Sequence, residues 1–264
     1  MSEEEIYLTD QHTMVESEDG SYTAFSEQFQ EHYHSTRDGA LHESLYKHVI
    51  PAFEHHKEKK QITILDICFG LGFNTLATLY YMRKEGIRKK VKIYSPEFDA
   101  ELIASLKAFH YPEIFEPFLP VIEALSEKQV YQDEELHIEL YIGDARLYLQ
   151  ACDITFDVVY QDAFSPATNP LLWTKEYFSD ITRLMADDAI LTTYSMALKT
   201  RLALYENGLE VYINRGAGYR DATLASKSLL EGYEKVDVEH KRRCNPDVKA
   251  LYDREVLERF STVQ

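Results

Sequence analysis

The chain has 264 residues, and its 45% hydrophobic and 12% aromatic content is that of a globular protein, which excludes a disordered one. Its formal net charge of −17 excludes a protein that coats its whole surface with nucleic acid. No apolar run is long enough to cross a membrane, and the start lacks a signal-peptide pattern. The three cysteines and ten histidines show no metal-ligand spacing. We therefore expect a cytoplasmic protein with neither a membrane nor a metal partner.

The charge is distributed unevenly along the chain. Residues 1–36 carry nine carboxylates and no Lys or Arg. Basic residues recur late, as Lys199, Arg201, Arg215, Arg220, Lys227, Lys241, Arg242 and Arg243. This late set predicts either an ordinary solvated face or a local basic patch for nucleic acid.

The N-terminal 60 residues are expected to mix polar loops with one helix over residues 41–53, whose apolar side chains share one face. From residue 62 onward, short apolar runs alternate with helical stretches. Strands are expected over 62–67, 91–95, 138–142, 156–160, 189–194 and 209–213, and helices over 73–84, 100–109, 116–131, 145–152, 171–185 and 198–207. This alternation predicts an α/β domain over 61–231, with a mostly parallel sheet and helices on both faces. Residues 232–264, helical over 246–260, are expected to form an appendage.

The first of these strands leads into a turn with two glycines. Asp66 lies near the strand end, Gly70 and Gly72 follow, and Asn74 lies in the next helix. Glycines at such a turn allow a ligand to approach the backbone closely. A dinucleotide site requires a third glycine in the spacing GxGxxG, which is absent, and an acid before the turn suits a cationic amino-acid group. Glycines that serve only the geometry of the turn are the alternative.

Acidic residues also follow the next three strand ends. After the second strand, Glu97 or Asp99 can accept the hydroxyl groups of a ribose. Asp144, directly after Gly143, can accept an adenine amino group, and Asp162 follows a further buried strand. Helix capping by Asp99 or Asp144, and turn formation by Asp162, are the plain alternatives. Because the acids follow four successive strands, we expect them to surround an adenosine-containing ligand.

Several short motifs extend from about residue 25 to residue 226. They comprise Ser-Glu-Gln-Phe at 26–29, Tyr-His-Ser at 33–35, Gly-Ala-Leu-His-Glu-Ser at 39–44, Phe-Gly-Leu-Gly-Phe-Asn at 69–74, Ser-Pro-Glu at 95–97, Thr-Tyr-Ser at 193–195 and Gly-Ala-Gly-Tyr-Arg at 216–220. The most specific is Asp-Ala-Phe-Ser-Pro-Ala-Thr-Asn-Pro-Leu-Leu-Trp at 162–173, which ordinary methyltransferases lack. In these motifs the chain resembles the methyltransferase half of the MnmC family, which finishes 5-methylaminomethyl-2-thiouridine at the tRNA wobble position.

The resemblance implies a Rossmann-like class I fold with a mostly parallel seven-stranded sheet and S-adenosylmethionine as cofactor. It implies N-methylation of an aminomethyl group on the wobble uridine, with tRNA as partner, Asp162 as the catalytic residue and residues 1–60 packed over the cofactor site. The cofactor-binding residues that it implies are Asp66, Phe69, Gly70, Gly72, Asn74, Glu97, Gly143, Asp144, Glu43 and Tyr33. The substrate-binding residues that it implies are Phe164, Tyr194, Ser195 and Arg220.

Two positions depart from the family pattern. Cys68 stands where the family usually has Gly, so the turn must accommodate a side chain there. The sequence around Arg220 is less basic than is usual in the family, which weakens the prediction of tRNA contact at this loop. The resemblance does not include the flavin-dependent oxidoreductase half of fused members, so we expect a methyltransferase domain alone.

Two other functions stay open at this point. A small-amine transferase, similar to polyamine aminopropyltransferases, would use a related fold and an acidic pocket and would suit the net charge of −17. A binding module that keeps the cofactor pocket without catalysis is the second alternative, although the presence of Asp162 favours an enzyme.

Overall fold

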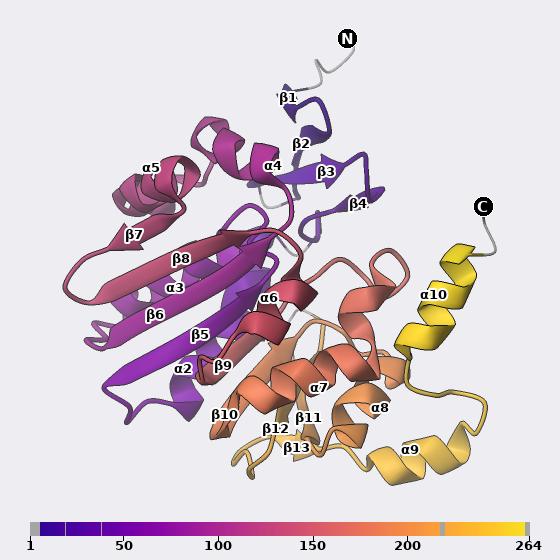
Figure 1. Ribbon diagram of the computed structural model, residues 1–264. Coiled ribbons are helices and arrows are strands. Elements are labelled where there is room, and N and C mark those ends of the chain that lie inside the picture. Colours follow the sequence, from indigo (N-terminus) through magenta and orange to yellow (C-terminus); the bar gives the residue numbers. More distant parts are fainter. Residues whose placement is uncertain (1–5, 19, 38, 217–219, 262–264) are drawn as a thin grey trace.

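The computed structural model describes residues 6–261, apart from 19, 38 and 217–219. Its centre is a nine-stranded sheet in the order β13-β11-β12-β10-β9-β5-β6-β8-β7 (Figure 1). The bounds are β5 Gln61–Ile67, β6 Lys90–Glu97, β7 Val130–Gln132, β8 Leu136–Ile142, β9 Phe156–Gln161, β10 Met185–Thr193, β11 Glu210–Asn214, β12 Ala222–Ser226 and β13 Glu234–Lys235. Strands β10, β9, β5, β6 and β8 pair in parallel, whereas β12 is antiparallel to both of its neighbours.

Helices cover both faces of this sheet. They are α1 Ala40–Ser44, α2 Ile50–His55, α3 Phe73–Lys84, α4 Ala100–Ser105, α5 Leu119–Lys128, α6 Ala145–Ala151, α7 Lys175–Leu184, α8 Leu198–Glu206, α9 Val238–Cys244 and α10 Asp253–Ser261. A π-helical segment, Leu45–Val49, joins α1 to α2, and 3₁₀ turns lie at Leu106–Ala108, Glu113–Phe118 and Pro170–Trp173. Within the described residues, no helix is long and apolar enough to span a membrane.

Side-chain alternation in β5 explains why the sheet buries both faces. Ile62 and Ile64 pack in the core beneath α3, whereas Leu65 and Ile67 pack in the core on the opposite face, with α7. Successive residues of a strand point to opposite faces, so Asp66 shares the face of Ile62 and Ile64. The sequence pattern therefore directs an acid toward the first turn of α3.

The predicted α/β class is confirmed, but the strand count differs. Seven central strands, from β11 to β8, are flanked by two short edge strands, β7 and β13. The helix expected over 116–131 ends at Lys128, and the chain reverses through Gln129 at a φ of 58° into β7. Strand β13 comes from residues expected in the appendage, and β12 falls in a stretch for which no element was expected.

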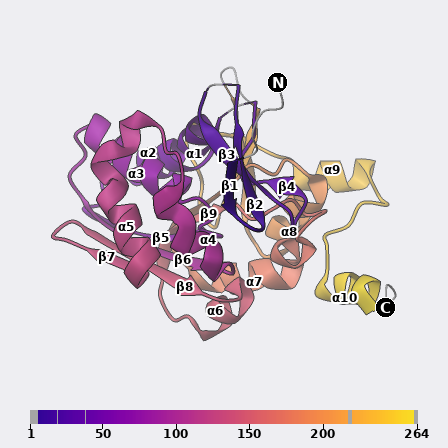
Figure 2. The same ribbon diagram turned by 90° about the horizontal axis from the view of Figure 1, so that it is seen from above.

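The N-terminal residues contain a second sheet that the sequence did not indicate. Strands β1 Ile6–Thr9, β2 His12–Glu16, β3 Tyr22–Ser26 and β4 Glu31–His32 form an antiparallel sheet in chain order. Figures 1 and 2 place it over the carboxyl ends of the central strands. These strands are short and their buried residues include the polar His12 and Thr23. The sequence therefore lacks the alternation of apolar and polar residues that would predict them.

Candidate active site

The turn after β5 adopts left-handed backbone conformations at Cys68, Gly70 and Gly72, with φ of 64°, 54° and 76°. A Cβ atom at Gly70 would lie 2.9 Å from Cδ1 of Tyr33, and one at Gly72 would lie 2.9 Å from Cε1 of Phe69. Both positions therefore require glycine for two reasons. The aromatic rings packed against the turn leave no room for a Cβ atom, and the φ angles are ones that other residues rarely adopt. Cys68 adopts its φ despite carrying a side chain, which is uncommon outside glycine.

Asn74 links two carboxylates at the strand ends. Its Nδ2 donates to Oδ1 of Asp66 at 3.2 Å and to Oδ2 of Asp162 at 3.0 Å. Burial raises the pKa of Asp66 well above its ordinary value, which outweighs the hydrogen bond from Asn74, and the charge of Asp162 raises it further. Asp66 thus lies beneath the turn, whereas Asp162 lines a cavity above it.

Glu97 ends β6 and contacts the glycine turn directly. Its Oε2 accepts the backbone N–H of Gly70 at 2.8 Å, and its Oε1 accepts that of Asp99 at 3.0 Å. Burial raises the pKa of Glu97, although these backbone hydrogen bonds oppose the increase. Asp99 instead caps α4 by accepting the N–H of Leu102 at 2.8 Å. The geometry therefore favours Glu97 over Asp99 as the residue that faces a ligand on the glycine turn.

Asp144 follows the neighbouring strand β8 and caps α6. It accepts the backbone N–H of Arg146 at 2.7 Å and is exposed to solvent. The N–H of Gly143 donates to the carbonyl oxygen of Glu97 at 2.8 Å, which joins this loop to the end of β6. Capping uses one oxygen of Asp144, so the other remains an acceptor at the sheet edge.

A cavity of about 380 Å³ opens at the carboxyl ends of β5, β9 and β10. It is lined by Glu31, His32, Tyr33, His34, Ser35, Thr36, Arg37, Glu43, Cys68, Phe69, Gly70, Phe73, Asn74, Asp162, Ala163, Phe164, Tyr194 and Arg220. Nine of the fifteen residues predicted for the site are in this lining. Asp66, Gly72, Glu97, Gly143, Asp144 and Ser195 are not. Sequence reasoning missed Glu31 and Arg37, which belong to no motif with an obvious chemical role.

Residues 29–37, which we call the cover, pass over this cavity. The hydroxyl of Tyr33 lies 3.0 Å from Nε2 of His12, and its ring packs 4.8 Å from that of Phe164. Glu31 accepts from the hydroxyl of Ser165 at 3.0 Å and from its N–H at 3.3 Å. Burial raises the pKa of Tyr33 far above its ordinary value. The cover is therefore attached to the loop after β9 through side chains.

Glu43 forms the helical wall of the cavity. Its Oε1 accepts from Nζ of Lys47 at 2.5 Å, and its Oε2 accepts from the N–H of Ser35 at 3.0 Å. Burial would raise the pKa of Glu43, but contacts with His34 and Lys47 outweigh it and hold this pKa well below its ordinary value.

Trp173 explains the long motif over residues 162–173. Its indole N–H donates to the carbonyl oxygen of Phe164 at 2.7 Å, and the hydroxyl of Tyr194 donates to that of Ala163 at 2.9 Å. These bonds hold the loop that carries Asp162. Ser195, predicted to bind substrate, is buried, and its Oγ lies 3.1 Å from Oγ1 of Thr200. Residues 217–219 of the last motif lie outside the described residues.

The late basic residues do not gather into one patch. Arg215 pairs with Asp221 and Glu234, and Lys227 donates to the carbonyl oxygen of Met185, at the opposite end of β10. Arg220 alone of this set lines the cavity. The predicted patch therefore reduces to residues at the cavity mouth.

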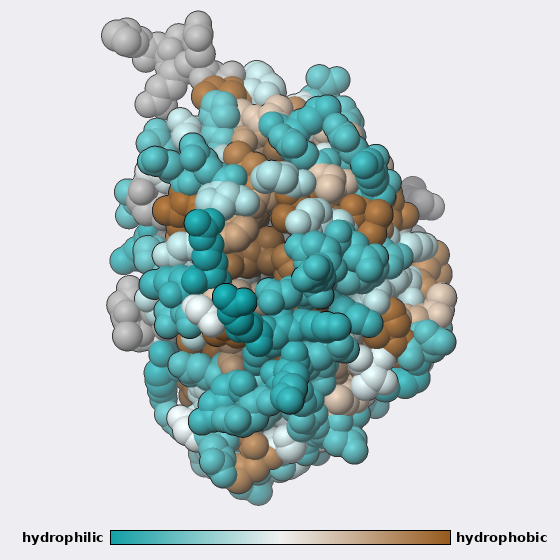
Figure 3. Space-filling view, turned by 90° about the vertical axis from the view of Figure 1, so that its left-hand side faces the viewer, coloured by the Kyte–Doolittle hydropathy of each residue, from teal (hydrophilic) through white to brown (hydrophobic). Residues whose placement is uncertain are grey.

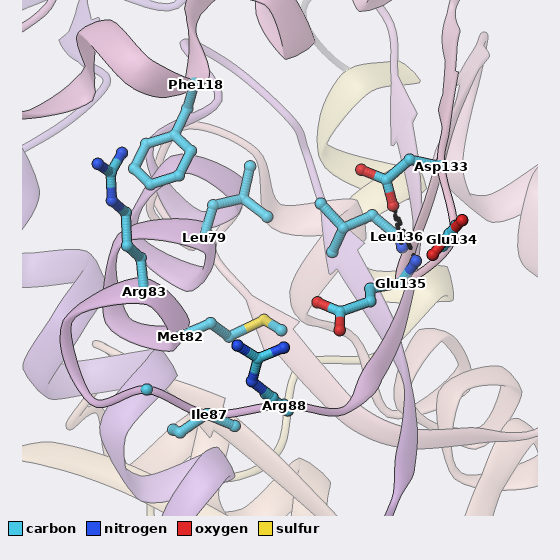
Figure 4. A pocket seen from close by; sticks show the side chains of 11 residues that line it. Leu79, Met82, Arg83, Ile87, Arg88, Phe118, Asp133, Glu134, Glu135 and Leu136 are labelled. Atoms are coloured by element: carbon cyan, nitrogen blue, oxygen red, sulfur yellow. Dashed lines mark hydrogen bonds between the residues drawn. The ribbon is translucent and has the colours of Figure 1, made fainter.

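A larger hollow, of about 540 Å³, lies at the other end of the sheet, between α3 and the β7–β8 turn. Its floor is apolar, with Leu79, Met82 and Phe118, and arginines and acids stand around it (Figure 4). The face in Figure 3 shows an apolar recess among hydrophilic side chains on this side of the molecule. Ligands of open α/β sheets bind at the carboxyl ends of the strands, so the smaller cavity is the candidate active site.

The strand ends suit a cationic adenosine derivative. Within the described residues, Asp66, Glu97 and Asp162 form no ion pair with Lys or Arg, and the basic group recorded beside them is the ring of His48, whose Nε2 lies 3.5 Å from Oδ1 of Asp162. A sulfonium and an ammonium group would supply the missing positive charge. Fold and site together define an S-adenosylmethionine-dependent methyltransferase.

The comparisons with known proteins agree with this class. A family model described as S-adenosyl-L-methionine-dependent methyltransferase matches residues 112–228. The crystal structure of MnmC2 from Aquifex aeolicus superimposes with a TM-score of 0.77 and 31% sequence identity, covering 88% of this chain and 75% of that chain. The chain therefore belongs to the MnmC-like methyltransferase family, and S-adenosylmethionine is its cofactor.

Two curated relatives are longer than this chain. An uncharacterized protein of Methanocaldococcus jannaschii is 32% identical over 231 residues, which cover 84% of this chain and 61% of that protein. The tRNA 5-methylaminomethyl-2-thiouridine biosynthesis bifunctional protein MnmC of Azoarcus sp. is 32% identical over 241 residues, which cover 86% of this chain and 37% of that protein. The chain thus spans less than two thirds of either relative.

Proposed function

We propose that the protein methylates the primary amine of an aminomethyl group on the tRNA wobble uridine, giving 5-methylaminomethyl-(2-thio)uridine. The observation that carries this proposal is Asp162, a carboxylate held by Asn74 at the mouth of the cofactor cavity. The MnmC relative of Azoarcus sp., named for tRNA 5-methylaminomethyl-2-thiouridine biosynthesis, supports the choice of substrate. The free cysteines, Cys68, Cys152 and Cys244, support a reducing, cytoplasmic setting.

The cofactor supplies an electrophilic methyl group on a sulfonium when bound. Glu97, on the glycine turn, would hold the ribose, and Asp144 would accept from the adenine amino group. The residues of the cover, Tyr33 foremost, would enclose the amino-acid end over Gly70. We propose for this reason that residues 1–60 form an N-terminal extension that packs over the cofactor site, that residues 61–231 form the methyltransferase domain, and that residues 232–264 form a C-terminal appendage.

Asp162 would act on the substrate amine. An aminomethyl group is largely protonated in water, and the nitrogen needs its lone pair to attack the methyl carbon. Asp162 binds the ammonium and takes its proton. The hydrogen bond between the carboxylate and the nitrogen also orients the nitrogen toward the methyl group. A carboxylate also stabilises the ammonium form, so orientation contributes more than proton removal. Phe164 and Tyr194 line the adjoining wall for the base.

Arginines at the cavity mouth support a polyanionic substrate despite the net charge of −17. Arg37 and Arg220 line the cavity. In the described part of the chain neither of them pairs with a carboxylate, whereas Arg215 and Arg146 do. Unpaired arginines at an active-site mouth suit phosphate groups.

The experiment uses the purified chain, S-adenosylmethionine, and tRNA that carries aminomethyl-uridine at the wobble position. We expect 5-methylaminomethyl-uridine on nucleoside analysis. Methylation of a free polyamine with no reaction on this tRNA would overturn the substrate and favour the small-amine transferase. Absence of methyl transfer to either acceptor, with the cofactor bound, would favour a non-catalytic module.

Binding of tRNA provides a separate test. Arg220→Ala should weaken binding and reduce the slope of log K against log salt by roughly one, because one phosphate contact is lost. Arg254→Ala is the control, since Arg254 is exposed in α10 and pairs with Glu258. Equal slopes in all three proteins would contradict phosphate contact by Arg220.

A further inference from the structure

His48 is a completely buried histidine next to the loop after β9 that carries Asp162. It belongs to the π-helical segment Leu45–Val49, within the continuous helix that runs from α1 to α2. Such π-segments are rare and occur often at functional sites. Its ring stands edge-on to Tyr160, with centroids 5.5 Å apart. The side chain does not line the cavity, so it can reach a substrate only through another residue.

The two ring nitrogens of His48 have different surroundings. Nδ1 lies 2.7 Å from Oγ1 of Thr192, at a hydrogen-bonding distance. Nε2 lies 3.5 Å from Oδ1 of Asp162 and has no hydrogen-bond partner among the described residues. A buried polar atom without a partner is costly, and here the atom faces the carboxylate to which the proposed function assigns the chemistry.

The tautomer of His48 follows from these contacts. If Nδ1 carried the proton, the bare lone pair of Nε2 would face the carboxylate of Asp162, which is repulsive. If Nε2 carries the proton, it attracts Oδ1 of Asp162, and the hydroxyl of Thr192 donates to Nδ1 at 2.7 Å in place of its longer, 3.4 Å contact with the carbonyl oxygen of Val159. The second arrangement is favoured because it places an N–H, and not a lone pair, 3.5 Å from the carboxylate of Asp162.

We propose that His48 is the positioning residue for Asp162, a role that rests on the proposed function. Nε2–H fixes Oδ1 while Asn74 fixes Oδ2, so the carboxylate is held from both sides. Thr192, on β10, fixes the tautomer. His48 transfers no proton and touches no substrate: it sets the direction in which Asp162 presents its lone pairs to the amine.

The test compares two amide replacements of similar polarity. The amide nitrogen of His48→Gln can occupy the place of Nε2, whereas that of His48→Asn reaches only the place of Nδ1. We expect His48→Asn to lower kcat about 10–100-fold, as loss of a group that orients an active-site side chain typically does, with KM and cofactor affinity within a few-fold. His48→Gln should recover most of the loss. Thermal unfolding and calorimetry with S-adenosylmethionine establish that each variant is folded.

A double variant separates positioning from a merely structural role. If His48 acts through Asp162, then His48→Asn should lower kcat no further once Asp162→Asn is present. Thr192→Val should copy the defect of His48→Asn, and Thr192→Ser should not, because serine keeps the hydroxyl. The proposal would be overturned if the fall in kcat of the His48→Asn, Asp162→Asn double variant equalled the product of the two single falls. Equal kcat in His48→Gln and His48→Asn would also overturn it.

The outcome is distinguishable from failure of the proposed function. That function fails if the unmutated protein leaves aminomethyl-uridine tRNA unmethylated. The role of His48 fails if the unmutated protein methylates this tRNA, Asp162→Asn is impaired, and His48→Asn keeps normal turnover.

Discussion

Asp66 at the end of β5 and Glu43 in α1 are buried carboxylates beside the same cavity, yet their neighbours differ. Glu43 contacts the ammonium of Lys47 and the backbone of Ser35, and its pKa is lowered. Asp66 contacts the neutral amide of Asn74, and its pKa is raised by burial. The helical wall therefore stabilises a negative charge, whereas the strand ends hold one at a cost in folding free energy.

This difference separates the structural part of the site from the part that awaits a ligand. The charge of Glu43 is compensated within the protein. The acids at the strand ends form no ion pair with Lys or Arg in the described part of the chain, which suits the cationic cofactor or substrate proposed to bind there. Binding of such a ligand should stabilise the fold in proportion to its affinity. Four substitutions test this comparison.

The largest effect is expected for Asp162→Asn, at the uncompensated strand ends. Asparagine keeps the size and the hydrogen-bonding capacity but cannot take a proton or hold an ammonium by charge. We expect a fall in turnover of about 10²–10⁴, with cofactor affinity within a few-fold. Single-turnover methyl transfer to aminomethyl-uridine tRNA measures it. Asp153→Asn, at an exposed position, is the control, and near-normal turnover of Asp162→Asn would contradict the assignment.

On the compensated wall, Glu43→Gln should lower the free energy of unfolding. The variant leaves the buried ammonium of Lys47 without its carboxylate, and breaking a buried pair costs about 3–5 kcal/mol. Because the pKa of Glu43 is lowered, the difference from the unmutated protein should shrink as the pH falls below the ordinary glutamate value of 4.5. Urea unfolding at several pH values measures this. Glu54→Gln, exposed in α2, is the control, and equal stability of both variants would show that Glu43 is uncompensated.

Glu97→Ala should weaken S-adenosylmethionine binding about 10–100-fold, because loss of a charged hydrogen-bond acceptor costs about 1.5–3 kcal/mol. Asp99→Ala removes a helix cap instead and should reduce stability while keeping cofactor affinity within a few-fold. Calorimetry with the cofactor compares the two. The assignment is wrong if Asp99→Ala has the larger effect on affinity.

The smallest effect is expected for Asp66→Asn, and its sign is opposite to that of Glu43→Gln. A raised pKa favours the folded state at low pH, and this contribution is lost as the pH rises toward the raised value. The variant lacks that loss, so its stability relative to the unmutated protein should increase as the pH rises above the ordinary aspartate value of 3.8. Thermal unfolding without cofactor measures the difference. If the stability difference between the two proteins did not depend on pH, the pKa of Asp66 would not be raised in the folded state.

The strand ends were accessible to sequence reasoning because their signals are local. An uninterrupted apolar run predicts β5, and Gly70 and Gly72 mark the turn that follows. The N-terminal sheet β1–β4 was not accessible, because polar residues such as His12 occupy buried positions in its short strands. His48 carried no signal either, since only the fold brings it next to Asp162, which is distant in sequence. Tyr33 and Glu43 came from the family resemblance, not from a chemical pattern.

Cys68 shows a further consequence of the acids at the strand ends. Its side chain lines the cavity proposed to bind the methyl donor, and a thiolate there would compete with the proposed amine substrate for the methyl group. Burial raises the pKa of Cys68 well above its ordinary value, and the charges of Glu97, Asp162 and Asp66 raise it further. The thiol therefore stays protonated and poorly nucleophilic. If the methyl donor binds at these acids as proposed, the negative charges that would attract its sulfonium also keep Cys68 from accepting the methyl group.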